Sequence, residues 1–224
     1  MDPILVKATL EDYPTMQNMA RFYVYDMSRY CGRVPGVFDW SCPENGLYEC
    51  VDLQLYFIEP NRHAFYVKVG TEKAGFALIN KLGTTPDVDW NIGEFFVLAK
   101  FQDSGIGQQI AKQLFEKFPG VWEVAAMLEN TGAYKFWHKA ITRYTGGSFT
   151  EKQTTIQKPE PHSMLVFRFE LPYPKTVSVH APFSCQRVRA VLSKLQTKSK
   201  LRTKWLLVSN RISVIGVHLN RITF

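Results

Sequence analysis

Apolar and polar positions along residues 1–171 follow the periods of strands and helices in turn. A polar opening before "MQNMARFYVYDMSRY" predicts a helix over residues 16–30, and a shorter helix is expected to stop at Pro60. β-branched and aromatic runs predict strands over residues 4–9, 63–69, 74–82, 90–101, 121–128 and 163–171.

Two further helices are expected in the second half of this region. Apolar residues recur every four positions from Ile106 to Phe118 and are followed by "FPG", which ends a helix. Residues 129–141, "ENTGAYKFWHKAI", predict another helix. Early helices, a strand meander and then alternating strands and helices predict an α/β or α+β fold, with helices on both faces of one sheet.

Charge divides the chain into two regions. The 224 residues carry a net charge of +7, but residues 1–170 hold all 20 acidic residues against 17 Lys and Arg, a net charge of −3. Residues 171–224 hold 10 Lys and Arg and no acidic residue. We therefore expect a domain over residues 1–171 and a basic C-terminal extension over residues 172–224 that is accessory or dispensable.

Several classes of protein are disfavoured by what the sequence lacks. No run of 18 apolar residues is present, so no membrane span is expected, and the acidic start predicts a cytoplasmic protein. The four cysteines form no CxxC pair and the five histidines form no pair at ligand spacing, so no metal site is predicted. The absence of GxSxG and HExxH disfavours hydrolases.

The loop "QDSGIG", residues 102–107, lies between an apolar strand and a helix. A glycine loop at this junction presents free N–H groups and the positive end of the helix dipole to a phosphate. A mononucleotide P-loop would need Lys and then Ser or Thr after Gly107, where Gln108 and Gln109 stand. A dinucleotide-binding loop would need a third glycine where Ile110 stands. Neither type of loop fits.

The same loop resembles the acyl-coenzyme A loop of the GNAT superfamily of N-acetyltransferases, written as Gln or Arg, two residues, Gly, one residue, and Gly or Ala. The order of the segments is also similar to this family, with "EFFVLAK" before the loop and "VWEVAAML" and "ENTGAYKFW" after its helix. The resemblance implies a mixed, largely antiparallel sheet of about six to seven strands, in which two strands splay apart to admit acyl-coenzyme A.

The resemblance further implies acetyl-coenzyme A as the acyl donor, without a metal. Main-chain N–H groups of the loop would hold the pyrophosphate, and the backbone near Val97 and Leu98 would bind the pantetheine arm and stabilise the oxyanion. Asp103 departs from the Arg or Lys often found there, and Asn130 has the alternative role of a helix cap. The expected cofactor contacts are Phe96, Val97, Leu98, Gln102, Asp103, Ser104, Gly105, Ile106, Gly107, Asn130, Ala133, Phe136 and Trp137.

Transfer of the acetyl group to an amine would need a base and an acid. Glu94 stands where the family often carries a glutamate and is the predicted base, with Glu129 as the alternative. Many members of the family have, where this chain has Trp137, a tyrosine that acts as the general acid and protonates the leaving thiolate. Tyr134, one helical turn earlier, is the predicted acid, unless the thiolate leaves without one.

The acceptor is expected beneath the first helix, as in the family. That helix would present Tyr25, Asp26 and Tyr30 to a cationic amine, with Tyr23 close by, and Glu129 would lie at the end of a neighbouring strand. A small amine, an amino-sugar antibiotic and a protein N-terminus all remain open as acceptors.

The sequence therefore predicts an N-acetyltransferase that moves an acetyl group directly from acetyl-coenzyme A to a primary amine of a small molecule or a protein. The alternative is a catalytically weak regulatory protein that binds acyl-coenzyme A. In that case the basic tail, residues 172–224, would bind a polyanion such as nucleic acid or an anionic surface. A homodimer is a further possibility.

Overall fold

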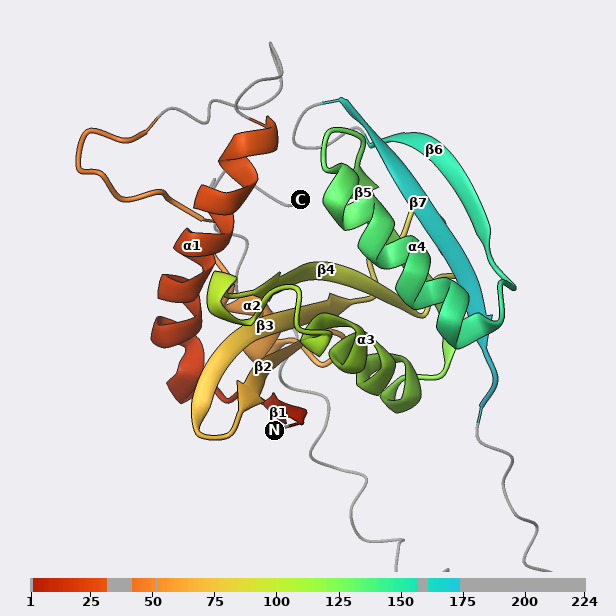
Figure 1. Ribbon diagram of the computed structural model, residues 1–224, viewed down its shortest axis with the longest axis horizontal. Helices are drawn as coiled ribbons and strands as arrows, with labels where there is room; N and C mark the ends of the chain where they lie inside the picture. The colour runs from red at the N-terminus through yellow and green to blue at the C-terminus, as the bar shows by residue number, and fades with distance from the viewer. Residues whose placement is uncertain (1, 32–41, 51, 157–160, 174–224) are drawn as a thin grey trace, which may run out of the picture. The chain divides into compact units, whose positions relative to one another are not determined.

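A single seven-stranded sheet organises the described part of the chain (Figure 1). The computed structural model describes residues 2–31, 42–50, 52–156 and 161–173. The strand order is β1-β2-β3-β4-β5-β7-β6, and all neighbours are antiparallel except the parallel pair β4 and β5. The strands are β1 (Pro3–Lys7), β2 (His63–Val69), β3 (Glu72–Asn80), β4 (Trp90–Val97), β5 (Gly120–Met127), β6 (Thr150–Ile156) and β7 (His162–Leu171).

Helices cover both faces of this sheet, as the sequence predicts. One apolar core lies between the sheet and the helices α3 and α4, and a second core lies between α1 and strands β2, β3 and β4. The helices are α1 (Tyr13–Cys31), α2 (Leu55–Ile58), α3 (Ile106–Lys117) and α4 (Thr131–Thr145), with the short 3-10 turns η1 (Leu10–Asp12) and η2 (Ala99–Phe101). No helix within the described ranges is long and apolar enough to cross a membrane.

Two predicted strand assignments differ from the structure. The strand expected over residues 90–101 stops at Val97, and residues 99–101 form η2 instead. Residues 150–156, "TEKQTTI", form the edge strand β6, which the hydrophobic pattern did not predict. An edge strand pairs on one side only, and β6 is largely exposed, so it needs few apolar side chains.

The parallel strands β4 and β5 separate soon after they begin. They pair at two positions only, Trp90 with Trp122 and Asn91 with Glu123. The predicted splayed pair is therefore present, and the remainder of β4 leaves its backbone groups on the β5 side without a neighbouring strand.

A β-bulge in β4 lies beside the point of separation. Leu78 of β3 pairs with Glu94, but the next residue pairs with Ile92, which leaves Gly93 unpaired. A Cβ atom on Gly93 would lie 2.2 Å from the hydroxyl of Tyr56, so a larger residue here would displace the Tyr56 side chain. The bulge sets the direction of the Glu94 side chain that follows it.

The predicted basic extension lies outside the described residues apart from residues 172 and 173. β7 ends at Leu171, where the predicted domain ends.

Candidate active site

The glycine loop presents the unpaired N-terminus of α3. Gly105 is the N-cap residue and adopts a φ of 81°, a left-handed conformation that favours glycine. The first main-chain bond of the helix runs from the Gln109 N–H to the Gly105 carbonyl at 3.2 Å. The N–H groups of residues 106–108 therefore have no acceptor within the helix, and they favour an anionic ligand.

A cavity of about 670 Å³, here called the loop cavity, opens at this N-terminus between α1, β4 and α4. Most residues that the sequence predicted to contact the cofactor line it. They are Phe96, Val97, Gln102, Asp103, Gly105, Gly107, Asn130, Ala133, Phe136 and Trp137. Gly107 is packed closely, because a Cβ atom there would lie 2.9 Å from the Phe136 ring.

Three predicted cofactor residues do not line the loop cavity. The Leu98 N–H donates to the Ala74 carbonyl at 2.8 Å, which uses it within the sheet. The Ser104 hydroxyl donates to the carbonyl of Phe101 at 2.6 Å. The Ile106 side chain is buried in the core, so this residue can contribute only its main chain.

The bond made by Leu98 fixes the direction of the Val97 backbone. Since hydrogen-bonding directions alternate along a strand, the N–H and carbonyl of Val97 face away from β3, toward the gap beside β5. The Gln102 side-chain amide donates to this carbonyl at 2.8 Å. Of the two predicted oxyanion donors, Val97 is therefore the one with a suitable orientation.

Two basic residues of α4 line the same cavity as Asp103. Lys139 and Arg143 are four residues apart and line the loop cavity together with Asp103. The Arg143 guanidinium also donates to the side-chain oxygen of Gln108, in the first turn of α3. Neither cation was predicted as a site residue, although their spacing from Phe136 places all three residues on one helix face.

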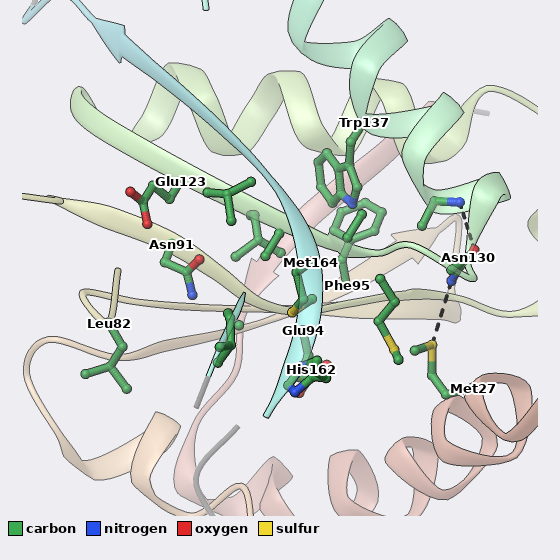
Figure 2. Close-up of a pocket in the computed structure, with 18 of the residues that line it drawn as sticks. Met27, Leu82, Asn91, Glu94, Phe95, Glu123, Asn130, Trp137, His162 and Met164 are labelled. Atoms are coloured by element: carbon green, nitrogen blue, oxygen red, sulfur yellow. Dashed lines mark hydrogen bonds between the residues drawn. The ribbon is translucent and has the colours of Figure 1, made fainter. Parts of the chain in front are cut away.

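A second cavity of about 510 Å³ adjoins the loop cavity and contains the predicted base, Glu94; we call it the Glu94 cavity. In Figure 2, Leu82, Asn91 and Glu123 lie at one end of it and Met27, Asn130 and Trp137 at the other, with Glu94 between them. Six residues line both cavities, namely Tyr23, Met27, Phe95, Asn130, Ala133 and Trp137.

The Glu94 carboxyl is unusually weakly acidic. Burial raises its pKa from an ordinary value of 4.5 to about 7, and a hydrogen bond with the Tyr23 side chain opposes this rise. Burial and the nearby Glu94 also raise the pKa of Tyr56 to about 12. No Lys or Arg among the described residues forms an ion pair with Glu94. A carboxyl in this state can accept a proton near neutral pH.

The other carboxylate of the Glu94 cavity already has hydrogen-bond and ion-pair partners. Glu123 is 3% exposed and accepts hydrogen bonds from the main-chain N–H and the hydroxyl of Thr84, at 2.6 and 2.8 Å. Arg168 forms an ion pair with it at 3.0 Å. Glu123 therefore holds the loop between β3 and β4 in place, which is a structural role.

The structure does not bring Tyr134 to either cavity. Its ring stacks on Phe167 at a centroid distance of 5.8 Å, and its hydroxyl lies 3.5 Å from a carboxylate oxygen of Glu151 in β6. Tyr134 lies three residues before Trp137 on α4, but its side chain faces β6 and β7 and not the cavities. The predicted acid is therefore not positioned to protonate a thiolate in the cavities.

The predicted acceptor residues are also placed differently from expectation. Glu129 and Tyr25 are exposed and line neither cavity. Asp26 and Tyr30 line the loop cavity, and Asp26 pairs with Arg29 at 3.0 Å. The α1 residues that line the Glu94 cavity are Ala20, Tyr23, Val24 and Met27, so the helix is rotated relative to the predicted face.

Asn130 caps α4 and connects it to α1. Its side-chain oxygen accepts a bond from the Ala133 N–H at 2.9 Å, and its amide nitrogen lies 3.8 Å from the sulfur of Met27 (Figure 2). No group of three or more His, Cys, Asp or Glu residues in the described ranges could hold a metal ion.

Comparisons with known proteins agree with this arrangement. A model of the acetyltransferase (GNAT) family matches residues 33–141. The structure is similar to an acetyltransferase from Thermus thermophilus, with a TM-score of 0.52, 15% identity, and coverage of 76% of this chain and 98% of that chain. An N-acetyltransferase from Staphylococcus aureus Mu50 gives a TM-score of 0.51, 12% identity, and coverage of 77% and 100%.

A third similar structure is a putative streptothricin acetyltransferase from Bacillus anthracis str. Ames in complex with acetyl coenzyme A, with a TM-score of 0.48, 13% identity, and coverage of 77% and 100%. No curated protein sequence matched the chain. Residues 33–141 thus match the model of the GNAT acetyltransferase family, and the described part of the chain has the fold of GNAT acetyltransferases.

Proposed function

We propose that this protein transfers an acetyl group from acetyl-coenzyme A directly to a primary amine, with Glu94 as the general base. The observation that carries this proposal is the position of Glu94. Its carboxyl is half-buried and has a pKa of about 7, it follows the bulge of the splayed strand, and it lies in the cavity that adjoins the glycine loop. A base with this pKa is well matched to an ammonium acceptor at neutral pH.

The loop cavity is the proposed site of acetyl-coenzyme A. The N–H groups of residues 106–108 would hold the pyrophosphate, while Lys139 and Arg143 supply positive charge that offsets Asp103. The pantetheine arm would run along the β5 side of β4, where the backbone groups of Val97 face the gap. The thioester would then reach the shared part of the two cavities.

The chemical step needs protons to leave the nitrogen and one proton to reach the sulfur. Glu94 takes a proton from the bound ammonium, and the free amine attacks the thioester carbonyl to form a C–N bond. The main-chain N–H of Val97 stabilises the oxyanion that forms. The C–S bond then breaks, and the thiolate leaves as coenzyme A once it is protonated.

Tyr23 is the proposed proton donor to the thiolate, in place of Tyr134. It lines both cavities, and its side chain is hydrogen-bonded to Glu94. A proton given by the Tyr23 hydroxyl to the sulfur is replaced by the proton held on Glu94, which returns both groups to their starting state. The second proton of the reacting nitrogen leaves to solvent.

Replacement of the base tests the proposal. Glu94→Gln keeps the size of the side chain and removes its basicity, so kcat/KM for an amine acceptor should fall by about 100-fold or more. The measurement is release of free coenzyme A thiol from acetyl-coenzyme A in the presence of an amine. Thermal stabilisation by acetyl-coenzyme A should be unchanged, which separates lost chemistry from lost binding. A Glu94→Gln enzyme as active as the wild type would exclude Glu94 as the base.

A further inference from the structure

We infer that the acceptor is a small monoamine with an apolar alkyl or aryl body, held with its ammonium at Glu94 and its body along strands β5 and β7. This inference rests on the proposed function, because it names the substrate class of the same site. It excludes polyamines, aminoglycosides and free amino acids as the preferred acceptors.

Apolar side chains of β5 and β7 line the Glu94 cavity, together with polar residues such as Thr154, Thr155 and His162. Side chains of β5 alternate between the two faces of the sheet, so Trp122 and Val124 enter the core beneath α3 and α4 while Ala125 and Met127 face the cavity. Within the described residues, the core beneath α1 contains no residue of β5, β6 or β7.

This apolar surface continues onto neighbouring elements. Leu82, Ile92, Met164 and Val166 also line the cavity, and Met164 projects into it in Figure 2. A ligand that covers such a surface is favoured by about 0.8 kcal/mol for each methylene that it buries. A volume of about 510 Å³ suits a small organic amine and is modest for a large oligosaccharide.

The charges in the cavity fit one positive group on the ligand. Glu94 and Glu123 are the acidic residues among the described lining residues, and Glu123 already has partners, an ion pair with Arg168 and hydrogen bonds from Thr84. A polyamine or an aminoglycoside carries several ammonium groups, and all but one would be buried without a carboxylate. Asp26, the other acid near this end of α1, lines the loop cavity and pairs with Arg29.

The described lining residues include no Lys or Arg, which disfavours a negative group on the ligand. An amino acid carries a carboxylate next to its amine, so that carboxylate would lie close to Glu94 with no Lys or Arg to pair with. His162 is the one basic side chain among the described lining residues. An amino acid and the amine formed by its decarboxylation therefore make a matched test pair. Phenylalanine and 2-phenylethylamine share the same ring and differ in the carboxylate.

The experiment compares kcat/KM for defined acceptors, measured as thiol released from acetyl-coenzyme A by the full chain. In the series from propylamine to hexylamine, kcat/KM should rise by about fourfold per methylene, which corresponds to about 0.8 kcal/mol. 2-Phenylethylamine should exceed phenylalanine by about 100-fold or more. Spermidine, kanamycin and trialanine amide should be poorer acceptors than hexylamine.

A pair of variants on β7 tests where the apolar body lies. Met164 lines the cavity, while Leu165, next along the strand, does not. Met164→Gln should lower kcat/KM for hexylamine by about tenfold and leave KM for acetyl-coenzyme A unchanged. Leu165→Gln is the matched control and should leave both constants unchanged.

The inference would be overturned if kcat/KM did not change along the alkylamine series. It would also be overturned if spermidine, kanamycin, phenylalanine or trialanine amide were acetylated at least as efficiently as hexylamine. Either result would leave acetyl transfer itself established. Equal losses in Met164→Gln and Leu165→Gln would also contradict it. If no amine of any class releases thiol although acetyl-coenzyme A stabilises the protein, the proposed function fails, and this inference fails with it.

Discussion

At the residue scale, Glu94, the proposed base, lies in the cavity that adjoins the glycine loop, whereas the ring of Tyr134 packs on Phe167 of β7. Glu94 was predicted as the base because it is the only acidic residue in "NIGEFFVLAK" and stands where the family often carries a glutamate. The position of Tyr134 depends on how α4 is rotated about its axis, and that rotation is decided by packing against Phe167 of β7. Sequence spacing gives the two faces of a helix but not which neighbour each face meets.

The acceptor residues illustrate the same limit. Tyr25 and Asp26 were predicted from their chemistry, yet Tyr25 is 61% exposed and Asp26 faces the loop cavity. Met27 lies next to them in sequence and lines both cavities. Since successive residues of a helix point about 100° apart, an error of one position moves a side chain from one cavity to another or to solvent.

The raised pKa of Glu94 predicts the pH dependence of catalysis. The base must be deprotonated to accept a proton, so kcat/KM should rise with pH, with an apparent pKa of about 7 for the free enzyme, and level off above it. An alkylamine acceptor remains protonated throughout this range and does not contribute. The measurement is a pH–rate profile from pH 5.5 to 8.5, and a flat profile would contradict the assignment.

The same pKa has a consequence for stability that provides an independent check. Because the folded state favours the neutral carboxyl, it binds more protons than the unfolded state between pH 4.5 and about 7. The contribution of Glu94 is therefore fully present below pH 4.5 and is lost as the pH rises to about 7. Glu94→Gln should stabilise the protein relative to the wild type at pH 8 and not at pH 4.5.

At the element scale, the strands, the long helices and the glycine loop could be predicted because their signals are local. The helix after the loop begins at Ile106, as its period indicates. β6 could not be predicted, since "TEKQTTI" is polar and becomes a strand only through pairing with β7. The splay of β4 and β5 could be expected only from the family resemblance, because strand separation depends on contacts between distant segments.

Two glycines allow a matched test of the loop. Gly105 and Gly146 both have positive φ, 81° and 66°, and a Cβ atom on either would meet nothing within 4 Å. Gly105→Ala and Gly146→Ala should each cost about 1 kcal/mol of stability. Only Gly105 caps α3 at the loop cavity, so only Gly105→Ala should weaken acetyl-coenzyme A binding, by about tenfold.

Binding is measured by titration calorimetry, and stability by denaturant unfolding. The Gly146 variant controls for strain in the left-handed region, because Gly146 caps the far end of α4 and lines neither cavity. Equal affinities of the two variants for acetyl-coenzyme A would show that the loop does not hold the cofactor.

At the scale of the whole molecule, the change of charge along the chain predicts a boundary. All acidic residues precede residue 171, and the last strand of the sheet ends there. We propose that residues 172–224 are accessory to the acetyltransferase domain. The full chain and a variant lacking residues 172–224 should have the same melting temperature and the same kcat/KM. Loss of folding or activity on truncation would assign these residues an essential role.

The central claim is that the Glu94 cavity and the loop cavity together carry acetyl transfer from acetyl-coenzyme A to an amine. The most direct measurement quantifies both products after incubation of the full chain with acetyl-coenzyme A and hexylamine. We expect N-acetylhexylamine and free coenzyme A in equal amounts, formed at least about 100-fold faster than with Glu94→Gln. Thermal stabilisation by acetyl-coenzyme A without either product, for every amine tested, would contradict the account.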